Sequence, residues 1–524
     1  MKKLIVCMMC CLLAMSAAFA WAEELALTPE NVVEAAKPFA EEIVGAMEKR
    51  AEEYAPKVIT LKNGIKVQRT PNTPDAQWHY YEMPISYNNY YLDADNRGCA
   101  VCHGDLADLA ANLKGYEHVI LQNNLGIEIT YQMCILCHSG GGFVDNYEDT
   151  FGGMLHAIHR NNKAFDAMGG DCWSCHQVDS NGNMAVWEDI RHEALRGISH
   201  IPNTEIQGEF SWNQDRLVAR DDVFSYDWIA RPSEIERYTR WMTGIIPDPE
   251  TDGIYDQWKI AVTGEVDNPV EMTITEWLEV IPVETTVMTM ECLDNVMGAP
   301  LIANCEITGI PVQKMFEYAG IRDSAASVKG ISYNPWATGD GSQIVSKTTQ
   351  SYEWMKKYGA YIVLEIGGEP LNYREGYPAQ FWVGGMNATG FTKEIRELNV
   401  SSEEYVAKYE SHYSNVYDNG TFMNRPNAAI WNLYEGQIFP AGEPITFGGY
   451  AHSPSFDISA IEISFDLGKT WNTFPVEGDD LTKWVCWEFT WMPPATGAYT
   501  IDVRASSSDG YVSAYPVSKL FNVQ

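Results

Sequence analysis

Three short motifs in the first third of the chain have the form Cys-x-x-Cys-His. Their residues are Cys99, Cys102 and His103; Cys134, Cys137 and His138; and Cys172, Cys175 and His176. Two thiols at this spacing can add to the vinyl groups of a porphyrin, while the adjacent histidine binds the iron. Cys-x-x-Cys pairs also hold structural zinc, but zinc does not require a histidine directly after the second cysteine. The motifs therefore predict three c-type haems, and hence a protein that carries electrons.

Each haem iron also needs a ligand on its second face, and histidine is the usual one. His118 and His156 each lie sixteen residues before the first cysteine of a motif, Cys134 and Cys172 respectively. The motifs themselves recur at intervals of 35 and 38 residues, which indicates a repeated unit. We therefore expect His118 and His156 each to be the distal ligand of the motif that follows it.

The other distal ligands are less constrained by the sequence. His159 is an alternative to His156, because the segment Leu155-His156-Ala-Ile-His159 places both histidines near one face of a helix. The third distal ligand is open among His192, which we prefer, His200 and His79. The fallback ligands, which would raise the haem potential, are Met133 and Met168.

The first residues agree with haem attachment outside the cytoplasm. Lys2 and Lys3 precede an apolar run over 4–15, and small residues follow up to Ala22. This pattern predicts a secretory signal peptide over residues 1–22 that lacks an arginine pair. No later segment is long and apolar enough to be expected to span a membrane. We expect an extracytoplasmic protein, periplasmic or secreted.

The composition sets outer limits on fold and partners. A chain of 524 residues is expected to form about three cores. Its net charge of −35 argues against nucleic acid and anionic lipid as partners. For a haem protein the expected partner is a redox protein or a quinol-linked cytochrome.

The second half of the chain resembles the sulfite-oxidase-type molybdopterin-binding domain. The residues that carry the resemblance are Trp258 to Gly264, Ile274 to Leu278, and Met290-Glu-Cys292-Leu-Asp-Asn295. The resemblance implies an α+β fold in which Cys292 is the catalytic thiolate that binds molybdenum, with Asn295 beside it. It also implies a molybdopterin cofactor.

Residues 433–524 are similar to the C-terminal immunoglobulin-like dimerisation domain of the same family. Its marks include Gly449-Tyr-Ala451 and the stretch from Ile461 to Trp471. The residues point to the same fold independently, because apolar side chains alternate along two stretches. These side chains are Ile461, Ile463 and Phe465, and Tyr499, Ile501 and Val503. The resemblance implies that two chains can form a homodimer.

The sequence departs from the family where a histidine and two arginines hold the phosphate end of molybdopterin. Glu375, Gln380 and Gly390 occupy those positions, and only Lys393 remains basic. Charge-assisted hydrogen bonds contribute roughly 1.5–3 kcal/mol each, and Glu375 would repel a phosphate. The export signal is a second objection to a bound molybdopterin. Proteins that receive molybdopterin in the cytoplasm generally leave it folded through a twin-arginine signal, and this signal has no arginine pair. For Cys292 the alternatives to a metal ligand are therefore a disulfide with Cys305 or an inert buried thiol.

We therefore expect a multidomain protein: a mostly helical or irregular trihaem cytochrome, an α+β sulfite-oxidase-like domain and an immunoglobulin-like β-sandwich. The expected boundaries are a signal peptide at 1–22, the trihaem domain at 23–205, a linker at 206–250, the molybdopterin-binding domain at 251–432 and the sandwich at 433–524. The first hypothesis is an oxidoreductase in which haems exchange electrons with a molybdenum centre acting on a small substrate. The second is an electron-transfer cytochrome whose molybdopterin domain is degenerate and serves as a docking or dimerisation scaffold. A third is catalysis at a haem that lacks a distal ligand.

Overall fold

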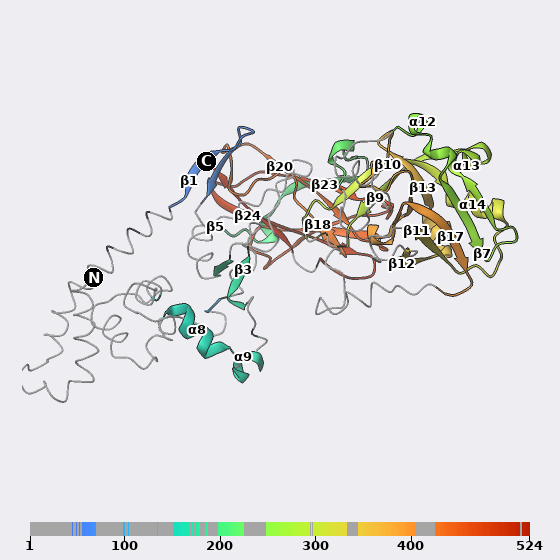
Figure 1. The fold of residues 1–524 in the computed structure, drawn as a ribbon. Coiled ribbons are helices and arrows are strands. Elements are labelled where there is room, and N and C mark those ends of the chain that lie inside the picture. Colours follow the sequence, from blue (N-terminus) through green and yellow to red (C-terminus); the bar gives the residue numbers. More distant parts are fainter. Residues whose placement is uncertain are drawn as a thin grey trace, which may run out of the picture.

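The computed structural model describes a defined part of the chain (Figure 1). The described residues are 45, 49, 52, 55–69, 98–99, 103, 134, 150–160, 162–167, 170, 174–178, 184–186, 198–224, 248–293, 295, 297–332, 344–404, 425–513 and 516–524. The predicted signal peptide and most of the predicted trihaem domain lie outside them. No helix among these residues is long and apolar enough to cross a membrane.

Residues 248–404 form a unit, called here the central domain, that contains two sheets. The first sheet consists of β9 (Glu284–Glu291), β10 (Ile302–Pro311), β13 (Ala360–Ile366), β14 (Glu369–Pro370), β15 (Gln380–Val383) and β16 (Thr392–Lys393). The second consists of β7 (Lys259–Gly264), β8 (Val270–Thr273), β11 (Ser327–Ser332), β12 (Ile344–Ser351) and β17 (Ile395–Ser401). In the first sheet β9 is an edge strand, and β10 is its one strand partner among the residues that the structure describes.

Helices cover these sheets and close the core of the central domain. They are α12 (Pro249–Asp252), α13 (Ile274–Val280), α14 (Val312–Ala319) and α16 (Tyr352–Tyr358). Helix α13 begins at Thr273, whose hydroxyl accepts from the Glu276 amide while the Glu276 carboxylate accepts from the Thr273 amide. Trp277 is fully buried and donates its indole N–H to the Ile260 carbonyl at 3.0 Å, which fixes α13 against β7. The central domain therefore has the mixed α and β composition that the sequence predicts.

The C-terminal part of the chain is a sandwich of two sheets over one core. One sheet contains β19 (Gln437–Phe439), β21 (Ile458–Ser464), β22 (Asn472–Pro475), β24 (Gly497–Ser507) and β25 (Val517–Val523). The other contains β18 (Asn427–Ala428), β20 (Ile445–His452) and β23 (Val485–Trp491). The alternating side chains predicted from the sequence are all buried there: Ile461, Ile463, Phe465, Tyr499, Ile501 and Val503. That pattern is confirmed, because side chains of both sheets share this core.

Segments from the first half of the chain complete the sandwich. The hairpin of β1 (Lys57–Thr60) and β2 (Lys66–Arg69) pairs with β19 beside the C-terminus (Figure 1). Strand β5 (Ile198–Ser199) pairs with β24, and β6 (Gly208–Asn213) pairs with β23 along six residues. The boundaries expected from the sequence placed β1, β2 and β5 in the trihaem domain and β6 in the linker. They differ because local patterning does not show which distant strand a segment will pair with.

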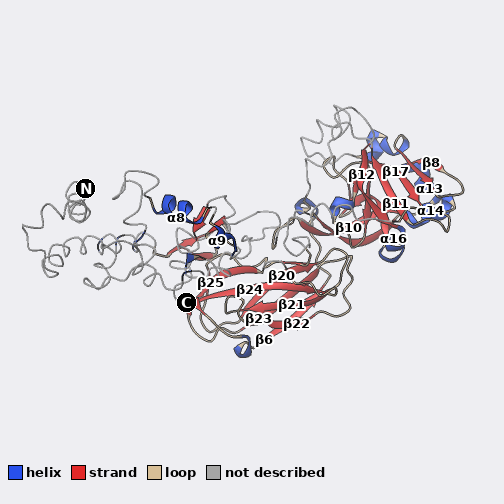
Figure 2. Cartoon of the chain, turned by 90° about the horizontal axis from the view of Figure 1, so that it is seen from below, coloured by secondary structure: helices blue, strands red, loops and turns tan. Residues whose placement is uncertain are grey.

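The central domain and the sandwich lie side by side and are joined by hydrogen bonds (Figure 2). The Thr289 amide on β9 donates to the Thr482 carbonyl at 2.7 Å, and the Trp484 amide donates to the Thr289 hydroxyl at 2.8 Å. An apolar cluster between them contains Ile302, Tyr450, Trp484 and Cys486. The sandwich thus covers the strand that leads into Cys292.

Gly449 on β20 is required by close approach of the backbone. A Cβ atom there would lie 1.7 Å from the Ala429 carbonyl oxygen and 2.6 Å from the Trp487 ring. We expect Gly449→Ala to lower the free energy of unfolding by about 2–3 kcal/mol, because the paired strands must separate. Gly448→Ala is the matched control, since its Cβ meets no atom closer than the Trp431 indole nitrogen at 3.1 Å. Urea unfolding of both variants measures the difference, and equal midpoints would contradict the argument.

The described part of the predicted trihaem domain consists of short elements. They are α8 (Phe151–His159), α9 (Lys163–Ala167) and a two-stranded pairing of β3 (His176–Val178) with β4 (Met184–Val186). Helix α8 begins at Thr150, whose hydroxyl accepts from the Gly153 amide. Strands predominate among the described residues as a whole. The few described elements of the trihaem segment do not test its mostly helical character, which stays a prediction.

Candidate functional site

Cys292 lies just after β9, in a tight turn that leads toward β10. Its amide donates to the Leu301 carbonyl at 2.9 Å, and the Asn295 amide donates to the Cys292 carbonyl at 3.0 Å. The Asn295 side-chain oxygen accepts from the Leu301 amide at 2.9 Å, so Asn295 closes the turn. Only 4% of Cys292 is exposed. The two residues identified by resemblance are therefore brought together, with the thiol held in the domain interior.

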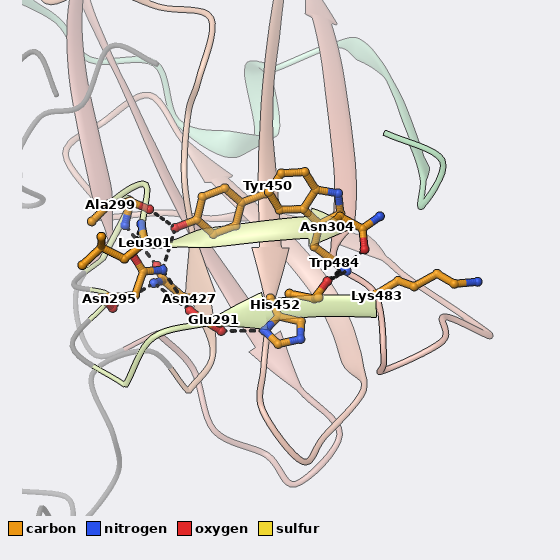
Figure 3. A network of polar contacts seen from close by, with 12 residues as sticks. Glu291, Asn295, Ala299, Leu301, Asn304, Asn427, Tyr450, His452, Lys483 and Trp484 are labelled. Atoms are coloured by element: carbon orange, nitrogen blue, oxygen red, sulfur yellow. Dashed lines mark hydrogen bonds and ion pairs between the residues drawn. The ribbon is translucent and has the colours of Figure 1, made fainter. Parts of the chain in front are cut away.

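A buried polar network surrounds this turn and links it to the sandwich (Figure 3). At its centre the carboxylate of Glu291 accepts from the Asn295 amide group at 2.9 Å and from Nδ1 of His452 at 2.5 Å. The Tyr450 hydroxyl accepts from Asn295 at 3.2 Å and donates to the Ala299 carbonyl at 2.6 Å. His452 and Tyr450 both come from β20, so the sandwich supplies part of the surroundings of Cys292.

The electrostatics of this network fix its protons. Because a carboxylate accepts hydrogen bonds, Nδ1 of His452 carries a proton and donates it to Glu291. The Nε2 atom of the same ring is buried and has no hydrogen-bond partner among the described residues. Burial and the negative charge of Glu291 raise the pKa of Tyr450 well above its usual range. Tyr450 is therefore a neutral donor, and His452 donates to Glu291 through Nδ1.

A second group of residues occupies the positions where the resemblance places the phosphate-binding residues. Glu375 is 3% exposed, and Arg220 of the 3-10 helix η6 (Arg220–Asp222) grips it with two bonds of 2.5 and 2.6 Å. Arg220 therefore neutralises Glu375, which weakens the repulsion of a phosphate that the sequence predicts. Gln380 is buried on β15, and Lys393 donates to the Arg374 carbonyl. The cations that would hold a phosphate in the family's manner are therefore not found among these residues.

Other polar groups near Gly390 fit a bound polar molecule. The Gln350 amide group donates to the Gly390 carbonyl at 3.2 Å, and its oxygen has no partner among the described residues. Trp382 Nε1 and the Thr392 hydroxyl are also buried without a partner in this part of the structure. Such orphaned groups commonly mark a missing ligand or water. The domain thus fits molybdopterin at its thiol end and through neutral donors, but not through a cationic phosphate site.

The structure contradicts the alternative in which Cys292 forms a disulfide with Cys305. Cys305 pairs with Met288 across the sheet and carries a free thiol, whereas Cys292 lies opposite Leu301. Leu301 precedes Cys305 by four residues, roughly 13 Å along a strand, which is too far for an S–S bond. Burial and the nearby Glu375 carboxylate raise the pKa of the Cys305 thiol. Cys305 is therefore an inert neutral thiol.

The third buried thiol, Cys486, lies on β23 in the apolar cluster between the domains. Burial raises its pKa to about 12, so the thiol is protonated at neutral pH. Cys486 is therefore a core thiol.

The predicted haem residues fall partly within the described structure. His103 and His159 have ring centres 5.9 Å apart, and His156 and His176 have ring centres 6.1 Å apart. The Gly98 amide donates to the Ser174 carbonyl at 3.0 Å, next to the first and third motifs. Cys99, Cys134 and Cys175 are also described. Outside the described residues lie Cys102, Cys137, His138, Cys172, His118 and His192.

Several residues of the candidate site were not expected from the sequence. Glu291 directly precedes Cys292, and its position at the end of a buried strand was a usable signal. Arg220, Asn427, Tyr450 and His452 reach the site only through tertiary packing, so no local pattern indicates them. Among the described residues, no group of three or more His, Cys, Asp or Glu side chains is arranged to hold a metal ion.

Comparison with known proteins gives the central domain a family. Residues 245–409 match the family described as the oxidoreductase molybdopterin binding domain. The NADH nitrate reductase of Petunia hybrida is 20% identical over 286 residues, which is 46% of this chain and 32% of that protein. The mitochondrial sulfite oxidase of Mus musculus is 25% identical over 224 residues, which is 38% of this chain and 40% of that protein.

A solved structure, the sulfane dehydrogenase SoxCD from Paracoccus pantotrophus, is 20% identical and covers 51% of this chain and 70% of its own, with a TM-score of 0.39. The chain spans about a third of the length of the first curated relatives, 32% in the case of Petunia hybrida. Residues 245–409 thus match a molybdopterin-binding oxidoreductase domain, and this part of the chain is similar to sulfite oxidase.

Proposed function

We propose that this chain is an extracytoplasmic electron-transfer oxidoreductase in which c-type haems pass electrons to or from a sulfite-oxidase-like molybdenum centre that acts on a small substrate. One observation carries the proposal: three Cys-x-x-Cys-His motifs precede a molybdopterin-binding oxidoreductase domain in one chain. A molybdenum centre changes oxidation state by two electrons per turnover and must exchange them with one-electron carriers. Haems in the same chain would perform that exchange.

The location and partner follow from the haem chemistry. The pattern of residues 1–22 supports export, and the thiols of the three motifs would receive haem after export. The acidic composition favours a basic redox partner, steered to the surface by charge. Such a partner is a soluble redox protein or a quinol-linked cytochrome. Dimerisation through the sandwich belongs to the same proposal.

On the molybdenum side, the residues that would hold the cofactor are Cys292, Trp382 and Thr392. A bound molybdopterin would supply oxygen-atom exchange with the substrate. The chain's own contribution would be a thiolate from Cys292, a turn fixed by Asn295, and neutral donors for the polar end of the cofactor. His452 lies close to the turn in the hydrogen-bond network, and in its neutral form it would be a base through Nε2.

A second candidate function is supported by the pair of Arg220 and Glu375. This bidentate ion pair occupies the part of the domain where the family holds a phosphate. A domain that has lost its cofactor would serve as a docking or dimerisation scaffold, and the haems would perform all the redox work. The two candidates share the haems and differ in molybdenum content.

The haem and molybdenum content of the unmodified chain separates the candidates, and two serine variants test which thiol binds the molybdenum. Chain matured in its own host is expected to contain three haems by the alkaline pyridine spectrum and one molybdenum by elemental mass spectrometry. Cys292→Ser is expected to lose at least about nine-tenths of the molybdenum, because a hydroxyl is a poor substitute for a thiolate ligand. Cys305→Ser is the matched control, a buried thiol thirteen residues further on, and should retain the metal.

Other results would reject parts of the proposal. Three haems without molybdenum in the unmodified chain would support the scaffold. Molybdenum retained in Cys292→Ser would remove Cys292 as its ligand. A colourless protein containing zinc would contradict the haem proposal itself.

A further inference from the structure

Helix α8 presents two histidines three residues apart, His156 and His159, in its last turn. Nδ1 of His159 lies 2.9 Å from the Leu155 carbonyl oxygen. A carbonyl can only accept, so Nδ1 carries a proton, and Nε2 is the nitrogen that the neutral ring presents to a metal. A backbone partner of this kind is the usual support of a metal-binding histidine. His159 is thus oriented and in the correct tautomer to bind a metal through Nε2.

The two histidines face different motifs. The His159 ring lies 5.9 Å from the ring of His103, which belongs to the first motif. The His156 ring lies 6.1 Å from the ring of His176, which belongs to the third motif. An imidazole nitrogen binds a transition metal at about 2 Å, and the ring centre lies about 1 Å further. Two rings that bind one iron from opposite faces therefore have centres about 6 Å apart, as both pairs do.

A separate contact brings the same two motifs together. The Gly98 amide, just before Cys99, donates to the Ser174 carbonyl, just before Cys175, at 3.0 Å. This backbone hydrogen bond does not involve α8. The first and third motifs are therefore adjacent although more than seventy residues separate them in the sequence. The second motif lies between them in the chain.

We propose that α8 supplies the distal ligands of two haems, His159 to the haem of the first motif and His156 to the haem of the third. This assignment rests on the proposed haem function and makes it more specific. His156 and His159 then do not compete for one iron. Each binds its own, and one turn of helix links the two haems.

The consequence is a closely spaced haem pair. Residues three apart on a helix are separated by about 4.5 Å along its axis, so the two irons share one short rigid support. One electron can leave a ferrous iron and reduce the neighbouring ferric iron, which needs no other reactant and no proton. Electrons entering at the first motif would pass directly to the third, which is the motif nearest in sequence to the sandwich and the central domain.

Histidine variants of the haem-loaded full chain test the assignment. His156→Ala and His159→Ala are each expected to give one additional five-coordinate haem. This haem appears as a high-spin signal in electron paramagnetic resonance and as one additional equivalent of carbon monoxide bound by the reduced protein. The double variant should bind two additional equivalents. Ile158→Ala is the matched control, because this exposed residue lies on the same helix and faces solvent. It should bind no more carbon monoxide than the unmodified chain.

The haem count by alkaline pyridine spectrum distinguishes the two levels of the proposal. No covalent haem in the unmodified chain would overturn the proposed function. Three haems with no added carbon monoxide in either variant would overturn the ligand assignment alone, as would one added equivalent in the double variant. If the alanine variants do not mature, His156→Met and His159→Met should each keep three haems. Each should shift one of them to a more positive potential. Unchanged potentials in both would also reject the assignment.

Discussion

Replacing Arg220 by alanine is expected to lower the free energy of unfolding by about 3–5 kcal/mol, because it leaves the carboxylate of Glu375 buried without a counter-charge. Glu375 is only 3% exposed, and both oxygens are bonded to the Arg220 guanidinium. Its other partner is the Asn372 amide at 2.8 Å, which cannot replace a full positive charge. Urea unfolding followed by tryptophan fluorescence measures the loss.

Two further variants test whether charge is the cause. In Arg220→Met combined with Glu375→Gln both charges are absent, so we expect most of the lost stability to return. Arg322→Ala removes an exposed pair with Asp267, in which the side chains are 49% and 68% exposed, and should cost less than about 1 kcal/mol. A double variant as unstable as Arg220→Ala would show that packing, not charge, explains the effect.

The ion pair of Arg220 and Glu375 also affects whether the central domain can bind a phosphate. Arg220 lies outside the matched residues 245–409, on a segment that follows β6 of the sandwich. Its guanidinium balances the carboxylate of Glu375, as cationic anchors would balance a phosphate in a domain that has them. Glu375 and Arg220 thus replace an anion-binding site by an internal ion pair, and the neutral donors near Gly390 are left for the remainder of a cofactor.

The sequence predicts well what depends on local pattern. The alternation of Ile461, Ile463 and Phe465 indicates a half-buried strand, and these side chains do lie in the sandwich core. The Thr273 and Glu276 spacing produces the start of α13 by a capping box, a local pattern that a sequence can show. Asn295 closes the turn that carries Cys292, and the family resemblance had placed these two residues side by side. In each case the relevant residues lie within a few positions of one another.

The sequence predicts poorly what depends on long-range pairing. Strand β6 joins β23, whose residues are more than 260 positions away, and nothing in the segment Gly208–Asn213 specifies that partner. Glu375 was interpreted as a repulsive charge because Arg220 could not be placed beside it from the sequence. The network of Glu291 was missed for the same reason, since His452 and Asn427 come from the sandwich.

Replacing Glu291 by alanine is expected to cost about 3 kcal/mol of unfolding free energy. Glu291 is fully buried, and its carboxylate accepts from His452 and Asn295. Its loss leaves both ring nitrogens of His452 without a partner in the described structure, and each unsatisfied buried group costs about 1–3 kcal/mol. Glu306→Ala, an exposed residue on the neighbouring strand, is the control and should change stability by less than about 0.5 kcal/mol.

Glu291→Gln separates the role of shape from the role of charge. The amide keeps an oxygen for Asn295 but presents an N–H to His452, so the ring must move its proton from Nδ1 to Nε2 to accept that bond. We expect a loss below about 1.5 kcal/mol and a changed tautomer, visible in the nitrogen NMR spectrum of histidine-labelled protein.

Because Asn295 holds the turn, Glu291→Ala should also speed labelling of Cys292 by a small thiol reagent, while Cys305 in the strand stays protected. If Cys292 is labelled at the same rate in Glu291→Ala and in the unmodified chain, the turn is held without Glu291. The network would then serve only to join the two domains.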